Sequence, residues 1–309
     1  MADPSYAVIS VGTNSCRLLI ARRDGAIVRP EYHETRGTRL GENVGASRRI
    51  DEAAAERTLA AVRDYAELAH SAQRIFCIGT SALRDAENSA GFADRFMQAT
   101  GVPLTILSGD EEAASSFAGA LRGLEVAGAA VPDAVCVTDV GGGSTEVGCR
   151  SRRDEAPRFA SLQIGAVRLT EKYLTSDPPS AAEIESCRLA VRTALDTLPA
   201  DVLLAGAVVA VGGTATTAAR MLQLIDEGSR GAVSDIPAAD LSALLKASIS
   251  LSKRDRLRLR GLPAQRADIF PAGLMILDEV AKRCHCNALT ICESDLLLGY
   301  LARHIERHT

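Results

Sequence analysis

The sequence predicts an α/β fold built from two similar halves that face each other across a cleft. Apolar runs of strand length alternate with helical patterns as far as Arg150, which is typical of α/β proteins. Residues 6–22 and 134–150 each contain an apolar strand, a glycine turn and a second apolar strand. Gly12 and Gly141 lie at equivalent positions of these two hairpins, and the flanking residues match at the same offset. This repetition indicates a duplicated unit.

Composition narrows the class of protein. A chain of 309 residues can form two domains, and 47% hydrophobic with 24% charged residues is typical of a globular protein. A net charge of −4 gives no sign of a nucleic-acid or membrane-surface binder, and no apolar run is long enough to span a membrane. We therefore expect a cytoplasmic protein. Cys77, Cys136 and Cys292 lie in apolar runs and are interpreted as small buried hydrophobes.

The first half continues with a long amphipathic helix. Asp51 can cap it, and Leu59, Val62 and Ala66 recur at helical spacing with charged residues on the other face. A strand, a turn, a helix and a further strand are then predicted at 74–79, 80–89, 89–100 and 104–107. These elements complete an alternating first half.

The second half repeats the alternation after a polar segment at 151–158. A strand precedes a helix that begins at Ala166, and Ser180 with Glu183 forms a capping box at the start of a helix over 181–198. The remaining elements are predicted as a strand at 207–213, a helix opened by Thr214, a segment of low periodicity at 227–238, helices at 239–251 and 267–283, a strand at 288–292 and a last helix at 294–307. Pro271 either kinks the helix over 267–283 or marks its true first turn.

Glycine turns at the ends of three strands predict a phosphate-binding cleft. Glycine can take φ > 0 and leaves backbone N–H groups accessible, and threonine and serine hydroxyls lie beside each turn. The helix opened by Thr214 adds its positive end. The candidate phosphate-binding residues are Gly12, Thr13, Asn14, Ser15, Gly141, Gly142, Gly143, Ser144, Thr145, Gly213 and Thr214. The alternative is three independent turns, which the common offset disfavours.

Three acidic residues are candidates for the chemistry. Asp139 ends an apolar strand and Glu146 follows the same turn, and their oxygens suit Mg²⁺, which takes one or two carboxylates beside a substrate phosphate. Asp139 can equally be a simple turn former. Ser108 and Glu111 form a capping box, which leaves Glu112 free to deprotonate an attacking water. The alternative is that Glu112 only favours the first turn of its helix.

Basic residues are candidates for holding the anion. Arg84 follows a strand and a turn and can grip a phosphate in the bidentate manner of arginine, although a surface salt bridge would also explain it. The basic stretch 253–260, including Arg258, and Arg266 beyond it can guide a polyanion, or can be a solvated helix face. Cys284 and Cys286 form a C-x-C that lacks the paired ligand sets of a usual zinc site.

Taken in order, these motifs resemble the exopolyphosphatase and guanosine pentaphosphate phosphohydrolase family, within the sugar kinase, actin and heat-shock ATPase superfamily. The segments that carry the resemblance are ISVGTNS, GTSALRDA, SGDEEA, DVGGGSTE, LQIGAVRLTE, VAVGGTATT and GLPAQRADIFPAG. The resemblance implies two ribonuclease-H-like (actin-like ATPase) domains, domain I over 1–125 plus 294–309 and domain II over 126–293, with the last helix crossing back to domain I. It implies Glu112 as catalytic base, Asp139 and Glu146 toward Mg²⁺, and Arg84 with the hairpin turns on phosphate.

Two departures from the family pattern stand out. Ser10 occupies the position where the family usually has Asp, in agreement with the internal repeat, so we expect Asp139 to hold the metal with less help. Leu297 and Leu298 replace an expected polar pair, so no ligand role is carried over to them. The chain resembles the short form of the family, for which we expect weaker processivity on long polyphosphate unless a homodimer extends the groove.

The resulting hypothesis is a Mg²⁺-dependent exopolyphosphatase that releases the terminal phosphate of inorganic polyphosphate by water attack. Hydrolysis of the 5′-phosphate of guanosine pentaphosphate is an alternative that the same residues could perform. Ser10 keeps open a non-catalytic sensor of polyphosphate or nucleotide. A kinase is also open, although no sugar-binding segment is recognisable.

Overall fold

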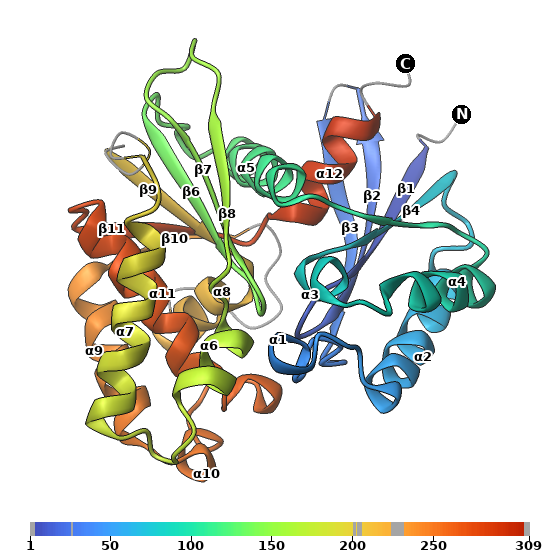
Figure 1. Cartoon of the computed structure of the whole chain (residues 1–309). Helices are drawn as coiled ribbons and strands as arrows, with labels where there is room; N and C mark the ends of the chain where they lie inside the picture. The colour runs from blue at the N-terminus through green and yellow to red at the C-terminus, as the bar shows by residue number, and fades with distance from the viewer. Residues whose placement is uncertain (1–3, 26, 200–201, 203–205, 224–231, 306–309) are drawn as a thin grey trace.

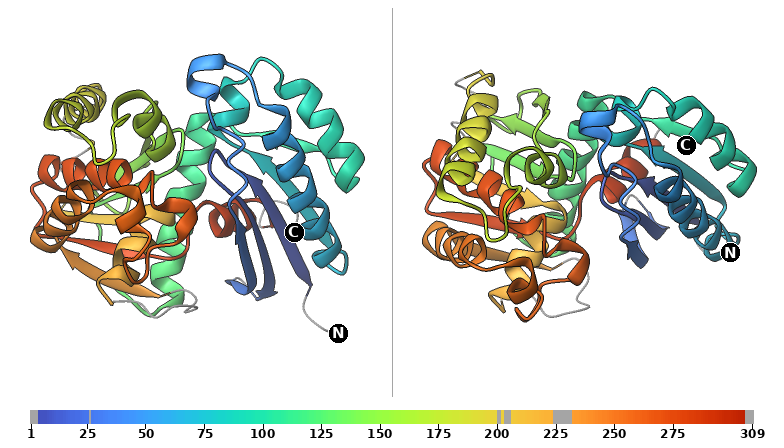
Figure 2. Two further views of the ribbon diagram at one scale, coloured as in Figure 1. Left: turned by 90° about the horizontal axis from the view of Figure 1, so that it is seen from below. Right: turned by 60° about the horizontal axis from the view of Figure 1, so that its bottom comes forward.

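The structure is a computed structural model and describes residues 4–25, 27–199, 202, 206–223 and 232–305. Two sheets stand in separate lobes, as the views in Figures 1 and 2 show. The first has the order β3-β2-β1-β4-β5, with the bounds Ile27–Arg36, Cys16–Asp24, Ser5–Val11, Arg74–Gly79 and Leu104–Ile106. The second has the order β10-β11-β9-β6-β7-β8, with the bounds Val233–Pro237, Ala288–Cys292, Ala207–Val211, Val135–Val140, Thr145–Arg150 and Arg158–Leu162.

The duplication predicted from the two hairpins extends to whole sheets. In each sheet the hairpin continues into a third antiparallel strand, β3 or β8, and its first strand pairs in parallel with β4 or β9. β5 and β11 add a further parallel strand at matching places. The second sheet has β10 as an additional antiparallel edge strand. The prediction of two similar α/β halves is therefore confirmed.

Alternating side chains bury both faces of the first sheet. In β1, Ala7, Ile9 and Val11 pack on one side, while Val8 points to the other, as the period of two in a strand requires. Helices α2 (Glu52–Leu68) and α4 (Ser89–Thr100) cover the first of these faces. Two short helices, α1 (Val44–Ser47) and α3 (Ser81–Asp85), lie on the side of this lobe that faces the other lobe (Figure 1).

The second sheet holds the larger core. One face packs against α7 (Ala181–Leu195), α8 (Gly212–Met221), α9 (Ala238–Ser250) and α11 (Phe270–Arg283), with α6 (Ala166–Tyr173) beside them. A short helix α10 (Lys253–Arg256) and the 3₁₀ turn η2 (Ala264–Arg266) lead into α11. Every residue of β6 is buried, so its polar members Thr138 and Asp139 are held inside the protein.

Two helices pack against each other between the sheets. α5 (Gly109–Val126) lies on strands β6, β7 and β8, whereas α12 (Leu296–Ile305) lies on β1, β2 and β3. A Cβ on Gly119 would overlap the Asp295 backbone, and one on Gly299 would overlap Ser115, so glycine permits this close crossing. The last helix returns to the first sheet as expected. α5 packs on the second sheet, although the predicted boundary at residue 125 assigned it to the first domain.

Most predicted helices and strands are present, and the predicted capping residues mark the starts of three helices. Asp51 caps α2, and both predicted capping boxes form, Ser108 with Glu111 and Ser180 with Glu183. Pro271 lies in the first turn of α11 and does not kink it.

Other element predictions were wrong or incomplete. The turn predicted over 80–89 contains α3, and the segment of low periodicity at 227–238 contains β10, although part of that segment lies outside the described residues. β3 was not predicted, because its polar alternation as a sheet edge resembles a loop. Among the residues that the structure describes, no helix has the length and apolar character needed to cross a membrane.

Candidate active site

The two hairpin turns have the same internal geometry and touch each other. The Gly12 amide donates to the Ser15 carbonyl at 3.0 Å, and the Gly141 amide donates to the Ser144 carbonyl at 3.0 Å. A Cβ on Gly142 would lie 3.0 Å from Cβ of Thr13, which places the second turn directly against the first. The prediction that these turns converge is confirmed.

The reason for glycine in the second turn differs from the one predicted. Gly141, Gly142 and Gly143 do not have a positive φ. Space is what requires them, because a Cβ on Gly143 would lie 2.6 Å from Oγ of Ser81. The carbonyls of Gly141 and Gly142 accept bonds from the start of α6 at 2.9 and 2.8 Å. Since C=O and N–H point in opposite directions in a trans peptide, the next amides point away from α6.

The third glycine junction is shifted by two residues from the prediction. α8 begins at Gly212, whose φ is +84°, and not at Thr214. Thr214 is buried and packs against Gly273, so its hydroxyl is directed away from the cleft. Thr216 and Thr217, two and three residues further along α8, line the cleft instead.

A cavity of about 280 Å³ lies where the three junctions meet. It is lined by all of the predicted phosphate-binding residues except Arg84, Thr145 and Thr214. Thr145 is absent because its hydroxyl donates to the Ile164 carbonyl at 2.7 Å, inside the second sheet. Asn14 lines the cavity while 6% exposed, and among the described residues neither its amide nitrogen nor its amide oxygen has a hydrogen-bond partner. Such a buried unpaired amide indicates a ligand that completes it.

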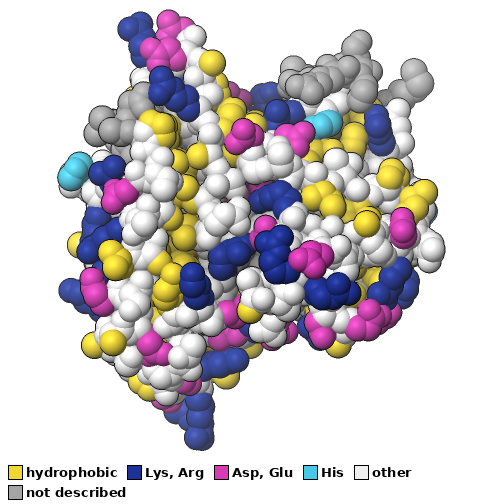
Figure 3. Space-filling model, viewed as in Figure 1, with side chains coloured by type: hydrophobic (Ala, Val, Ile, Leu, Met, Phe, Trp, Pro, Cys, Tyr) yellow, Lys and Arg dark blue, Asp and Glu magenta, His cyan; other side chains and the backbone are white. Residues whose placement is uncertain are grey.

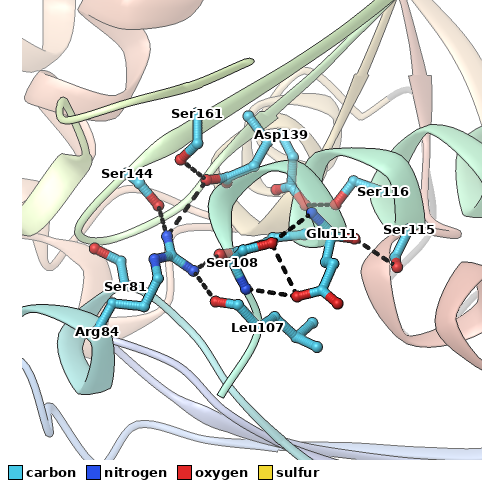
Figure 4. Close-up of polar contacts among 12 residues, drawn as sticks. Ser81, Arg84, Leu107, Ser108, Glu111, Ser115, Ser116, Asp139, Ser144 and Ser161 are labelled. Carbon is cyan, nitrogen blue, oxygen red and sulfur yellow. Dashed lines mark hydrogen bonds and ion pairs between the residues drawn. The ribbon is translucent and has the colours of Figure 1, made fainter. Parts of the chain in front are cut away.

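Asp139 and Glu146 form a direct cross-strand pair of the β6–β7 hairpin, so their side chains share one face. The Ser116 hydroxyl donates to Oδ2 of Asp139 at 2.7 Å, and the Ser161 hydroxyl donates to Oε1 of Glu146 at 2.7 Å (Figure 4). Burial, together with the nearby Asp295 charge, raises the pKa of Asp139 to about 6. Burial, together with Glu112 and Asp139, raises the pKa of Glu146 well above its usual range.

Glu112 faces the same carboxylates from the first turn of α5. Glu111 is held by the capping box, as predicted, while Glu112 is 7% exposed and lines the cavity. Burial raises the pKa of Glu112 to about 7, although the Arg84 charge opposes this rise. A carboxyl group with a pKa near 7 can take a proton from water at neutral pH.

Arg84 connects the candidate base to the phosphate turn. Its Nη1 donates to Glu112 at 2.5 Å and to the Leu107 carbonyl at 2.9 Å, and its Nη2 donates to the Ser144 hydroxyl at 3.4 Å (Figure 4). These bonds place the Arg84 guanidinium beside the second glycine turn. Arg84 itself is not among the residues that line the cavity. Its buried partners exclude the alternative of a surface salt bridge.

Three further arginines enter the cavity from different elements. Arg17 of β2 pairs with Asp295, and Arg220 of α8 pairs with Glu293 at 2.6 Å. Arg266 has no ion pair among the residues that the structure describes, and a Cβ on Gly213 would overlap its guanidinium. Burial and the charges of Arg17 and Arg220 lower the pKa of Arg266 to about 10. An anion in the cavity would relieve this repulsion.

The basic stretch 253–260 was a candidate for guiding a polyanion, but none of its residues lines the cavity. Arg258 is 70% exposed at its side chain and pairs with Asp255 at 3.5 Å. Arg256 is buried and donates to backbone carbonyls, which fixes α10 against the loop before α11. Basic side chains do gather along the middle of the face seen in Figure 3, between the two lobes. Arg266 is thus the member of the predicted polyanion groove that the structure brings to the site.

Sequence reasoning missed several lining residues that simple periodicity would have indicated. Arg17 and Leu19 lie two positions apart on β2, so both face the cavity. Thr216, Thr217 and Arg220 follow Gly213 at helical spacing on one face of α8. Glu293, Ser294 and Asp295, which precede α12, could not be placed without the fold.

The sequence departures at both chain ends lie in this cavity. Ser10 is buried and lines it, as Asp139 does. Leu297 and Leu298 also line it, and both belong to the apolar cluster between α12 and the first sheet. Their role is therefore packing along an apolar wall.

Comparisons with known proteins agree over nearly the whole chain. The model of the Ppx/GppA phosphatase family matches residues 19–308. Exopolyphosphatase 2 of Mycobacterium tuberculosis is 37% identical, over 97% of this chain and 98% of the relative. Guanosine-5′-triphosphate,3′-diphosphate pyrophosphatase of Aeromonas salmonicida is 28% identical, over 97% of this chain and 59% of the relative.

The fold comparison leads to the same family. The crystal structure of an exopolyphosphatase-like protein superposes with a TM-score of 0.91 at 27% identity, over 100% of this chain and 99% of that chain. The predicted fold class, an actin-like pair of α/β domains, is confirmed. From the family match and the full-length relatives, this chain belongs to the Ppx/GppA phosphatase family.

Proposed function

We propose that this protein is an exopolyphosphatase that releases the terminal phosphate of inorganic polyphosphate by hydrolysis. The observation that carries the proposal is the Arg84 bridge, because it holds the buried base candidate Glu112 beside the glycine turn at Ser144. The relative of 37% identity carries the name exopolyphosphatase. Hydrolysis needs a base next to the bound phosphate and little further covalent chemistry from the protein.

In the proposed reaction the terminal phosphate lies against the two hairpin turns. Backbone amides and the Thr13 and Ser144 hydroxyls donate to its oxygens. Glu112 accepts a proton from water as the water oxygen bonds to phosphorus, and the bridging P–O bond breaks toward the shortened chain. Throughout the reaction, Arg84 orients Glu112 and balances the negative charge of the phosphate at the second glycine turn. Arg266 holds the next phosphates of the chain.

The donor atoms in the cavity suit Mg²⁺. Asp139 and Glu146 supply carboxylate oxygens, and Asn14 supplies an amide oxygen without a partner. Among the described residues, no three His, Cys, Asp or Glu side chains are grouped as a metal cage, and Mg²⁺ typically keeps several waters beside one or two carboxylates and a phosphate. When bound, Mg²⁺ would neutralise charge on the phosphate oxygens. A cytoplasmic location and a homodimer stay predictions.

A second substrate is favoured by a specific part of the cavity. Leu19, Pro30 and Leu297 are apolar residues of the cavity wall, and Leu19 is the cross-strand partner of His33, which also lines the cavity. An apolar wall of this kind can take a nucleoside, and the Aeromonas salmonicida relative is named for a guanosine substrate. Guanosine pentaphosphate is therefore the second candidate.

Glu112→Gln tests the hydrolase directly. The variant keeps the size of the side chain and removes the base, so phosphate release from polyphosphate with Mg²⁺ should fall at least about 100-fold while polyphosphate binding persists. Glu111→Gln is the matched control, since Glu111 serves the helix cap. Equal and slow release by the wild type and Glu112→Gln would support a sensor instead. Short polyphosphate, long polyphosphate and guanosine pentaphosphate measured side by side decide the substrate.

A further inference from the structure

The two hairpins differ at one cross-strand pair. In the second hairpin Asp139 faces Glu146 across the strands, and the equivalent pair of the first hairpin is Ser10 with Arg17. Ser10 is 1% exposed and lines the cavity. The first hairpin therefore presents a hydroxyl and a guanidinium where the second presents two carboxylates.

A carboxylate reaches this place from the other end of the chain. Asp295 immediately precedes α12, is 8% exposed, and lines the cavity together with Ser10 and Asp139. Its Oδ2 pairs with Arg17, the strand partner of Ser10. Its Oδ1 accepts the Leu297 amide at 3.2 Å, which caps the helix. After burial, the charge of Asp295 is the main cause that raises the pKa of Asp139, in keeping with two carboxylates that face one space.

The depth of Asp295 in the cavity is fixed by packing. A Cβ on Gly119 would overlap the Asp295 carbonyl, and a Cβ on Gly299 would overlap the Ser115 carbonyl, one turn from it on α5. The close crossing of α5 and α12 thus sets where the start of α12 lies. Because α5 also carries Glu112, the same crossing positions the candidate base and Asp295 relative to each other.

An independent feature of the cavity indicates that a ligand is held there. Asn14, in the first hairpin turn, is buried, and neither amide atom has a partner within the described part of the chain; it lines the same cavity. An amide oxygen beside carboxylates is a suitable donor for a hydrated divalent cation.

We propose that Asp295 supplies, from the last helix, the carboxylate that the first hairpin lacks at Ser10, and that it binds the hydrated Mg²⁺ ion opposite Asp139. This inference rests on the proposed function. Since the described residues contain no group of three such side chains placed to coordinate one ion directly, Asp295 acts through the hydration shell of the ion. Outer contacts of this kind change metal affinity by about 10- to 100-fold.

Mn²⁺ binding to the metal-free protein tests the proposal without measuring turnover. Free Mn²⁺ is followed by electron paramagnetic resonance in a titration of wild type, Asp295→Asn and the double variant Ser10→Asp with Asp295→Asn. Asparagine can still accept the Leu297 amide, so the helix cap is kept. Asp295→Asn should weaken Mn²⁺ binding about tenfold, and the double variant should bind within about threefold of wild type.

Glu293→Gln is the matched control, because Glu293 lines the same cavity and pairs with Arg220. Its replacement removes an equal charge away from Asp139 and should leave Mn²⁺ affinity within about threefold of wild type. Equal losses in Asp295→Asn and Glu293→Gln, or wild-type affinity in Asp295→Asn, overturn the assignment of Asp295 while the proposed hydrolase stands. If wild type itself binds no Mn²⁺, the metal role in the proposed function fails, and the inference fails with it. Thermal unfolding of each variant confirms that it is folded.

Discussion

Asp139→Asn is expected to stabilise the metal-free protein while it abolishes hydrolysis. Asp139 is 7% exposed, and burial with the Asp295 charge raises its pKa from 3.8 to about 6. A carboxyl group whose pKa is higher in the folded state favours folding at low pH, and its ionisation opposes folding as the pH rises from 3.8 through about 6. Above pH 6 this displacement corresponds to about 3 kcal/mol of lost stability.

Asparagine has nearly the same shape and can still accept the Ser116 hydroxyl, so the substitution removes the charge with little change in packing. The variant should be more stable than wild type by up to about 3 kcal/mol at pH 8, or roughly 5 °C in Tm, and by about half as much at pH 5. The assay is thermal unfolding followed by circular dichroism, in a chelating buffer at both pH values. Added Mg²⁺ should raise the Tm of wild type more than that of the variant.

Asp268→Asn is the matched control with the opposite sign. The Arg39 partner lowers the pKa of Asp268 in spite of its burial, so its charge favours folding above the unfolded pKa. Removing that charge should lower the Tm at pH 8. If Asp139→Asn melts at or below wild type at pH 8 without metal, the Asp139 carboxylate is not a destabilising buried charge. The reasoning about the metal site would then be refuted.

Two further predictions concern the substrate. Phosphate release should fall as the pH falls through about 7, because the Glu112 base becomes protonated; initial rates that stay constant from pH 6 to 8 would contradict its role. Gly213→Ala should displace the Arg266 guanidinium and raise the KM for polyphosphate about tenfold. Gly206→Ala is the control and should leave the KM unchanged, because a Cβ there meets nothing within 4 Å. Equal KM values in the two variants would exclude Arg266 from substrate binding.

The fold was predictable because its signals are local and repeated. The caps at Asp51, Ser108 and Ser180 predicted three helices, and the matching glycines of the two hairpins predicted the duplication. β3 and β10 were missed for a physical reason. Each is an edge strand, so its exposed or polar positions break the apolar run by which an inner strand is recognised.

The site was predictable only where it lies next to a turn or a cap. Glu112, Asp139 and the glycine turns belong to such signals. Thr145 and Thr214 were assigned to the site because hydroxyls beside glycines usually face the turn, but the register of β7 and the earlier start of α8 direct them into the protein. Asp295 belongs to no local motif, since a helix crossing with α5 brings it to the cavity.

The charges along the cavity are those that the proposed polyanion and its divalent cation would complement. Burial raises the pKa of Glu112, Asp139 and Glu146, because it removes the charged form of each carboxylate from water. Burial and the charges of Arg17 and Arg220 lower the pKa of Arg266, which lines the same cavity. Among the residues that the structure describes, no ion pair joins Arg266 to any of these three carboxylates. In the proposed reaction, a phosphate chain with its divalent cation would supply both charges at once, the cation to the carboxylates and the phosphates to Arg266.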